Sequence, residues 1–172
     1  MISIREQALS WVPRWVIVNT IQKQTVAEHS FYVALLADRI ATILGIPVDD
    51  FKLRYRLQRA ALTHDMFESI SGDLPSPYKR CISDDAAYSK YRHLFEEEIP
   101  VDEIEYKIIK IADLMEALIF LEREKSLGNT SILDVYFEIH AKLRAACMEF
   151  GEDVWLRIDA EYHTVCYFQD PL

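Results

Sequence analysis

Glycine and proline are scarce in this sequence, with four and six residues among 172. A β-sandwich or barrel needs many tight turns built from these residues, so their scarcity argues against both and favours helices. Long apolar runs are missing too, since no uncharged stretch approaches the roughly 20 residues of a membrane-spanning helix. Arg5 and Glu6 interrupt the segment where a signal peptide would have its apolar centre. We therefore expect a cytoplasmic protein without a membrane partner.

Basic residues are also in deficit, with 19 Lys and Arg against 28 Asp and Glu and a net charge of −9. No segment gathers them into the stripe that a polynucleotide partner requires. A small phosphorylated substrate needs only a few well-placed cations and stays possible. The cysteines, Cys81, Cys147 and Cys166, are odd in number and lack a CxxC pair, which indicates free thiols in a reducing compartment.

What the sequence does contain is a series of helix signals. Thr25-Val-Ala-Glu28 is a capping box, and the helix that it opens should run to about Leu44, where Gly45 and Pro47 stop it. Further helices are expected over 3–11, 50–67, 84–97, 101–127, 131–150 and 153–168, with a loop over 70–78. We predict an all-α fold, a single-domain bundle of about six to seven helices over residues 1–172.

Three ionisable residues interrupt the apolar faces of these helices: His29, His64 and Asp113. Their apolar neighbours on the same faces are Val33, Leu36 and Ile40 beside His29, Leu53, Leu57, Ala60 and Ala61 beside His64, and the segment 108–120 around Asp113. Burying an unpaired carboxylate costs several kcal/mol, so such a group must be protonated, paired or bound to a metal.

Each residue alone has an ordinary structural explanation. A buried histidine can bond to a backbone carbonyl, and Asp113 can pair with Lys110. The set of His29, His64, Asp65 and Asp113 favours a metal instead, because two imidazoles and two carboxylates suit a divalent ion and leave positions open for catalysis. We expect Co²⁺, Mn²⁺, Mg²⁺, Fe²⁺ or Zn²⁺ as the cofactor.

The spacing of these residues resembles the H…HD…D signature of the HD-domain phosphohydrolase superfamily. Short sequence motifs around these residues strengthen the resemblance. They are Arg14-Trp15, Ala27-Glu28-His29-Ser30, His64-Asp65-Met66-Phe67-Glu68, Gly72-Asp73-Leu74-Pro75-Ser76-Pro77 and Ala112-Asp113. They look like the branch of bacterial 5′-deoxynucleotidases and also like compact phage dATP triphosphohydrolases. The resemblance implies a divalent metal on the four residues and a small 2′-deoxynucleotide substrate. By analogy alone it suggests a homo-oligomer.

Two further acidic residues are candidates for catalysis. Glu68 lies one helical turn beyond His64, at i+4, so we expect its carboxylate to share the metal side of the helix for acid–base work or for orienting water. The alternative for Glu68 is an exposed carboxylate near a helix end. Asp73 is expected either to transfer a proton or hold an additional metal, or simply to form the turn after Gly72.

Five residues are candidates for substrate binding: Arg14, Trp15, Ile17, Pro77 and Lys79. Arg14 and Lys79 can each neutralise a phosphate, although a loop lysine is often merely solvated. Trp15 offers a flat face for a base or sugar, and Ile17 can abut a purine edge and disfavour guanine. For both, the alternative is packing in the core.

The function expected from these residues is hydrolysis of the 5′-phosphate ester of 2′-deoxynucleotides. The short interval between Asp65 and Asp113, together with Ile17, favours a phage-type dATP triphosphohydrolase that releases deoxyadenosine and triphosphate. The alternative is a 5′-deoxynucleotidase that removes phosphate from deoxynucleoside monophosphates with broad base preference. A non-catalytic nucleotide-sensing module is disfavoured, because a sensor has no need for the full ligand set and Glu68.

Overall fold

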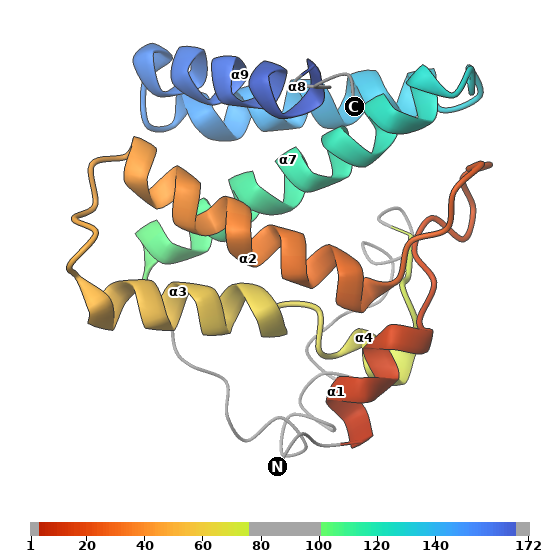
Figure 1. The fold of residues 1–172 in the computed structure, drawn as a ribbon, viewed down its shortest axis with the longest axis horizontal. Coiled ribbons are helices and arrows are strands. Elements are labelled where there is room, and N and C mark those ends of the chain that lie inside the picture. The colour runs from red at the N-terminus through yellow and green to blue at the C-terminus, as the bar shows by residue number, and fades with distance from the viewer. Residues whose placement is uncertain (1–3, 76–100, 168–172) are drawn as a thin grey trace, which may run out of the picture.

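A computed structural model describes residues 4–75 and 101–167, and within these ranges the chain forms helices and no strand (Figure 1). The helices are α1 (Ile4–Ala8), the 3₁₀ turn η1 (Leu9–Trp11), α2 (Val26–Ile43), α3 (Phe51–Thr63), α4 (Glu68–Ser71), α7 (Glu103–Ser126), α8 (Leu133–Met148) and α9 (Glu152–Tyr167). The predicted all-α fold is confirmed. The helix expected over 84–97 lies outside the described residues.

Side-chain caps fix where the two central helices begin. Thr25 and Glu28 form both halves of the predicted capping box at α2. Asp102 and Glu105 form a second box at α7, which starts the helix expected over 101–127. At the other end of α2, Gly45 adopts a φ of +81°, a left-handed conformation that ends the helix as expected.

The helix predicted over 50–67 is interrupted in the structure. α3 ends at Thr63, and the following residues form tight turns in which Met66 N bonds to Thr63 O and Glu68 N bonds to Asp65 O. An i→i+3 turn advances by about 120° per residue rather than 100°. The prediction that Glu68 lies one α-helical turn beyond His64 is therefore wrong, and the i+4 relation does not place its side chain.

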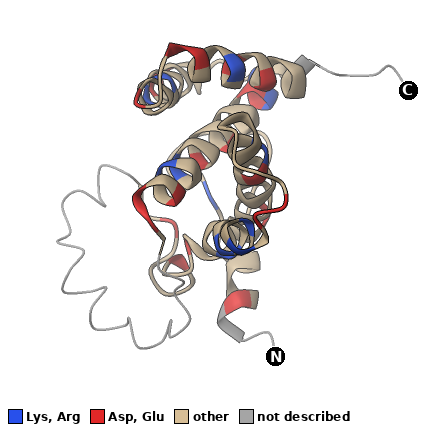
Figure 2. Ribbon diagram, turned by 90° about the vertical axis from the view of Figure 1, so that its left-hand side faces the viewer, with Lys and Arg blue, Asp and Glu red and all other residues tan. Residues whose placement is uncertain are grey.

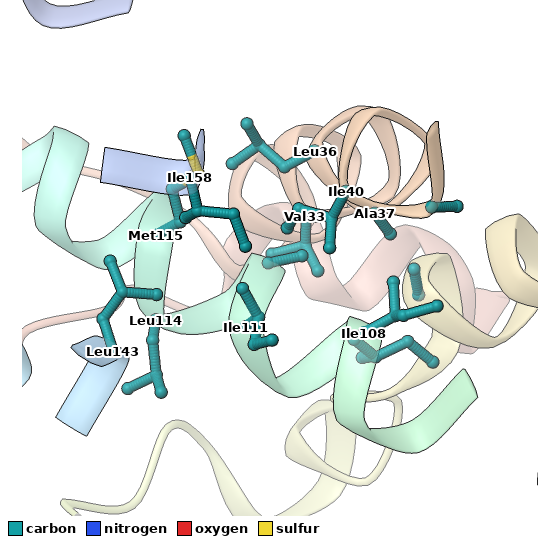
Figure 3. Packing of buried hydrophobic residues seen from close by; sticks show 14 of the residues in the cluster. Val33, Leu36, Ala37, Ile40, Ile108, Ile111, Leu114, Met115, Leu143 and Ile158 are labelled. Carbon is teal, nitrogen blue, oxygen red and sulfur yellow. The ribbon is translucent and has the colours of Figure 1, made fainter. Parts of the chain in front are cut away.

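The apolar core lies where α2 crosses α7 and where α8 and α9 cover α7 (Figures 1 and 3). Figure 3 shows Val33, Leu36, Ala37 and Ile40 from α2 on the side of α7 that carries Ile108, Ile111 and Met115. Leu114 of α7 points away from α2 and lies beside Leu143 of α8, and Ile158 of α9 lies near Met115. The predicted inward face of α2 is confirmed. His29 continues that face at the end of α2 nearest the C-terminal end of α3.

Basic and acidic residues are mixed along most of the described helices (Figure 2), but α3 carries four basic residues and no acidic one: Lys52, Arg54, Arg56 and Arg59. Arg54 pairs with Asp38, and Arg56 pairs with Glu105. Among the described helices, none has the length and apolar character needed to cross a membrane.

Candidate active site

Four predicted ligands from three parts of the fold meet at one point. His29 on α2, His64 after α3 and Asp113 on α7 each offer an atom, and these atoms lie within 4.8 Å of one another. Asp65 joins them, with Oδ2 3.6 Å from His29 Nε2 and 3.3 Å from His64 Nε2. Asp113 Oδ1 lies 3.3 Å from His29 Nε2. Residues far apart in the sequence therefore form one cluster of nitrogen and oxygen donors.

The orientation of the two imidazole rings fits a divalent metal ion. His64 is held through Nδ1, which lies 2.7 Å from the carbonyl oxygen of Ala61, and His29 is held through Nδ1 by Glu116. The buried Nε2 atoms of both rings have no hydrogen-bond partner among the described residues. A neutral imidazole that donates from Nδ1 carries its lone pair on Nε2. Two such lone pairs facing two carboxylates form a suitable donor set.

The charges at this centre shift two protonation equilibria. Burial opposes a charged His29, but the carboxylates of Asp113 and Glu116 outweigh it and raise the pKa of His29. Burial also opposes a charged Asp113, yet His29 and Lys110 hold the pKa of Asp113 well below its usual value. Lys110 lies 2.8 Å from Asp113 Oδ2, so the expected lysine pair exists and leaves Oδ1 facing the cluster.

The two candidate catalytic carboxylates lie on α4 and in the loop after it. Glu68 begins α4 and is only 4% exposed, so the alternative of a solvated carboxylate at a helix end is wrong. Asp73 Oδ2 accepts a hydrogen bond of 3.3 Å from the backbone nitrogen of Trp15. Asp73 therefore connects the loop after α4 to the candidate substrate segment.

Glu116 connects Arg14 directly, and Trp15 through Gln24, to the candidate metal ligand His29. Arg14 pairs with Glu116 at 3.1 Å, and its guanidinium carbon lies 5.3 Å from the centre of the Trp15 ring. The Trp15 ring stacks on Phe120 of α7 with centres 5.4 Å apart and an interplanar angle of 9°. Trp15 has a φ of +63°, a conformation that is costly for a bulky residue and must be held by its surroundings.

The other predicted substrate residues are placed differently. Ile17 is 71% exposed, so the alternative of core packing is wrong for this residue. Pro77 and Lys79 lie outside the described residues.

Sequence reasoning missed two residues that connect this site. Glu116 is 4% exposed and bonds to His29, Arg14 and Gln24. Gln24 is 7% exposed and accepts a hydrogen bond of 3.0 Å from Trp15 Nε1. A signal for Glu116 was present, because it is a charged residue in the same apolar segment as Asp113 and three positions after it.

Comparison with known proteins shows what this chain is similar to. Residues 5–85 match the model of the YfbR-like 5′-deoxynucleotidases, a segment that contains His29, His64 and Asp65. The 5′-deoxynucleotidase YfbR of Escherichia coli is 28% identical, with 83% of this chain and 72% of that protein aligned. A 5′-deoxynucleotidase of Klebsiella pneumoniae is also 28% identical, with 73% of each protein aligned.

Solved structures support the fold. The HD phosphohydrolase DatZ of cyanophage S-2L, bound to dA and one catalytic Zn²⁺ ion, superposes with a TM-score of 0.71 at 20% identity over 96% of both chains. An HD-domain phosphohydrolase of Listeria innocua superposes with a TM-score of 0.63 at 19% identity, covering 96% of this chain and 83% of that one. Motif, fold and relatives agree: the chain is similar in sequence to the YfbR-like 5′-deoxynucleotidases and shares its fold with HD-domain phosphohydrolases. These likenesses indicate a metal-dependent hydrolase.

Proposed function

We propose that the chain hydrolyses the 5′-phosphate ester of 2′-deoxynucleoside monophosphates to a deoxynucleoside and phosphate. The observation that carries the proposal is the convergence of His29, His64, Asp65 and Asp113 beside Arg14 and Trp15. The matched family and the relatives from E. coli and Klebsiella, which are 5′-deoxynucleotidases, favour a monophosphate over the triphosphate that the sequence pattern suggested first.

In this proposal the four converging residues hold a divalent ion. Such an ion polarises a phosphoryl oxygen and makes water a stronger nucleophile at neutral pH. Arg14 donates one hydrogen bond to Glu116. A guanidinium has five N–H donors, so its remaining N–H groups can bind the phosphate. Arg14 thereby neutralises charge that builds on the phosphate oxygens as the ester breaks.

Glu68 is the residue to which we assign proton transfer. Hydrolysis forms a bond from the water oxygen to phosphorus and breaks the bond from phosphorus to the 5′-oxygen, so one proton must leave the water and one must reach the departing oxygen. A carboxylate near the reacting atoms can carry this proton. Glu68 is buried directly after the turn that carries His64 and Asp65. For Asp73 we propose an orienting role through its bond to Trp15.

Nucleoside binding is assigned to Trp15 and Ile17. Trp15 is partly buried against Phe120, which gives the indole a fixed position. Ile17 is exposed two residues later, where its side chain is free to meet the edge of a base. We keep Pro77 and Lys79 as proposed substrate residues.

A second candidate is hydrolysis of dATP to deoxyadenosine and triphosphate. It is favoured by the likeness to DatZ over 96% of both chains, since that protein was solved with dA, and by the exposed Ile17. Both candidates break the same bond to the 5′-oxygen and use the same residues. They differ in the length of the phosphate chain that the site must accommodate.

Product analysis separates the two candidates. Purified protein would be incubated with Co²⁺, Mn²⁺, Mg²⁺ or Zn²⁺ and a panel of dNMPs, dNTPs and matching ribonucleotides, with His64→Ala as the control for contaminating phosphatase. We expect deoxynucleoside and phosphate from dNMPs. Deoxyadenosine and triphosphate from dATP alone would support the second candidate. Binding of nucleotides without any cleavage would identify a sensing module and refute both.

A further inference from the structure

We infer that Glu116 is a positioning residue that couples the metal ligand His29 to the Arg14–Trp15 segment. This inference rests on the proposed function, because it assigns Arg14 and Trp15 to the substrate. Glu116 lies on α7 at i+3 from Asp113, so the two carboxylates share one side of the helix. Asp113 faces the predicted metal, whereas Glu116 reaches the outer side of the His29 ring.

The carboxylate of Glu116 accepts from three different side chains. Its Oε2 bonds to His29 Nδ1 and to an Arg14 nitrogen 3.1 Å away, and its Oε1 accepts from Gln24 Nε2 at 2.5 Å. All three partners are well shielded, with 13% exposure for the Arg14 side chain, 0% for His29 and 7% for Gln24. Because these side chains are shielded from solvent, each bond is electrostatically stronger than it would be in water.

The bond to His29 sets the chemistry of the other ring nitrogen. A carboxylate that accepts the Nδ1 proton holds the ring in the tautomer whose lone pair is on Nε2. It also makes the imidazole a stronger electron donor to a metal. His64 receives the same orientation from the neutral carbonyl of Ala61, so Glu116 adds a negative charge behind one ligand.

The hydrogen bond between Glu116 and Gln24 also fixes how Gln24 binds the indole of Trp15. A glutamine amide has one donating and one accepting end. Since Glu116 takes the donating end of Gln24, the accepting oxygen faces Trp15 Nε1 at 3.0 Å. This chain of bonds, together with Asp73 on the backbone nitrogen, supports the left-handed conformation of Trp15.

Glu116→Gln tests the inference, because glutamine keeps the shape but has one acceptor oxygen for three N–H donors. The matched control is Glu122→Gln, which alters another buried carboxylate of α7, bonded to Lys125 and Tyr162. Both variants should lose stability, but only the first should affect the metal. Metal-stripped proteins would be titrated with Co²⁺ alone at one fixed pH, by calorimetry and by the visible absorption of the bound ion.

We expect Glu116→Gln to weaken Co²⁺ binding on the order of 10- to 100-fold, with Glu122→Gln within about twofold of wild type. The variant should also raise KM for the best nucleotide. A Co²⁺ affinity of Glu116→Gln equal to that of the control overturns the inference. If wild type binds Co²⁺ but cleaves no nucleotide, the proposed function fails while the Co²⁺ titration still decides the role of Glu116 at His29.

Gln24→Met provides a second test should Glu116→Gln fail to fold. It removes the hydrogen bonds that join Glu116 to Trp15 and leaves His29 and Arg14 in place. We expect KM to rise roughly three- to tenfold, the value of one lost hydrogen bond, with Co²⁺ affinity unchanged. An unchanged KM overturns the coupling.

Discussion

His64 contributes more to the cluster than to the packing around it. Its side chain is 17% exposed and its ring is held by the carbonyl of Ala61 at the end of its own helix. We therefore expect His64→Ala to lose Co²⁺ retention and turnover while circular dichroism shows nearly unchanged helix content. Metal content and activity would be measured on the same preparation. Normal turnover would refute the ligand assignment.

Glu68 is buried, so its replacement must be isosteric. If it carries a proton during hydrolysis, Glu68→Gln should retain Co²⁺ and bind substrate but lose on the order of 10²–10⁴ in kcat. Pre-steady-state and steady-state kinetics would separate binding from chemistry. A variant without Co²⁺ would make Glu68 a ligand, and an unchanged kcat would leave it a structural residue.

Ile17 is exposed, which makes its proposed contact with the base easy to isolate. Ile17→Ala should leave the melting temperature nearly unchanged, because exposed substitutions away from special features cost at most about 0.5 kcal/mol. If Ile17 meets the purine edge that carries the 2-amino group of guanine, the variant should improve cleavage of the dG substrate relative to the dA substrate. We expect a change of roughly tenfold to a hundredfold in the ratio of kcat/KM. An unchanged ratio would remove Ile17 from the site.

The connection from η1 to α2 is held to the end of α7 by a buried carboxylate. Glu124 is fully buried and accepts from the backbone nitrogens of Ile21 at 2.6 Å and Gln22 at 2.7 Å, and from Asn129 at 2.8 Å. Burial opposes the charge, but these hydrogen bonds outweigh it and lower the pKa of Glu124 from its ordinary value of 4.5. The segment that carries Trp15 is thus anchored by an ionised group.

The sign of the resulting pH dependence follows from linkage. A carboxylate whose pKa is lower when folded stabilises the protein above its unfolded-state pKa and loses this contribution as pH falls through the folded-state pKa. Glu124→Gln should cost about 1–3 kcal/mol at neutral pH, and the difference from wild type should shrink as the pH falls below 4.5. Urea unfolding of wild type and Glu124→Gln from neutral to acidic pH tests this pH dependence. A difference that stays constant with pH would contradict the role of the charge.

Helix boundaries were predictable from local chemistry, whereas the turn at His64 was not. Thr25 and Glu28 indicate the start of α2, because a capping box consists of residues within a segment of four. The break after Thr63 carries no comparable signal, since Met66 and Phe67 continue an apolar pattern that a helix would also give. Periodicity reports which face is buried and does not report a local change of pitch.

In the candidate site, too, features set by the local sequence were predictable, whereas features set by contacts between distant residues were not. The buried position of His29 follows from its apolar face on α2, and the structure places it at 0% exposure. The partners of Glu116 could not be read from the sequence. Arg14 and His29 are 102 and 87 residues away from it along the chain, and its bonds depend on how α2 crosses α7. An ionisable residue in an apolar segment indicates that its side chain has a bonding partner, but the sequence does not show which residue that partner is.

At the scale of the whole molecule, the candidate metal centre is a junction between elements. Its donors come from α2, from the turn that follows α3 and from α7, the helix that α8 and α9 cover (Figure 1). The single domain and the homo-oligomer expected from the sequence stay predictions. The junction itself has a thermodynamic consequence, because an ion that binds only the folded arrangement must stabilise it.

Metal removal should therefore lower the melting temperature. With free Co²⁺ at about 100 times its Kd, binding adds about 2.7 kcal/mol to the free energy of unfolding. For a chain of 172 residues, each kcal/mol shifts Tm by roughly 2–4 °C, so we expect a rise of about 5–11 °C over the metal-stripped protein. The rise should grow with the logarithm of Co²⁺ concentration, as one-site linkage requires. His64→Ala is the control, because it keeps the helices but removes a donor from the junction. An equal rise in that variant would show that Co²⁺ stabilises the protein elsewhere and would contradict the proposed ligand set.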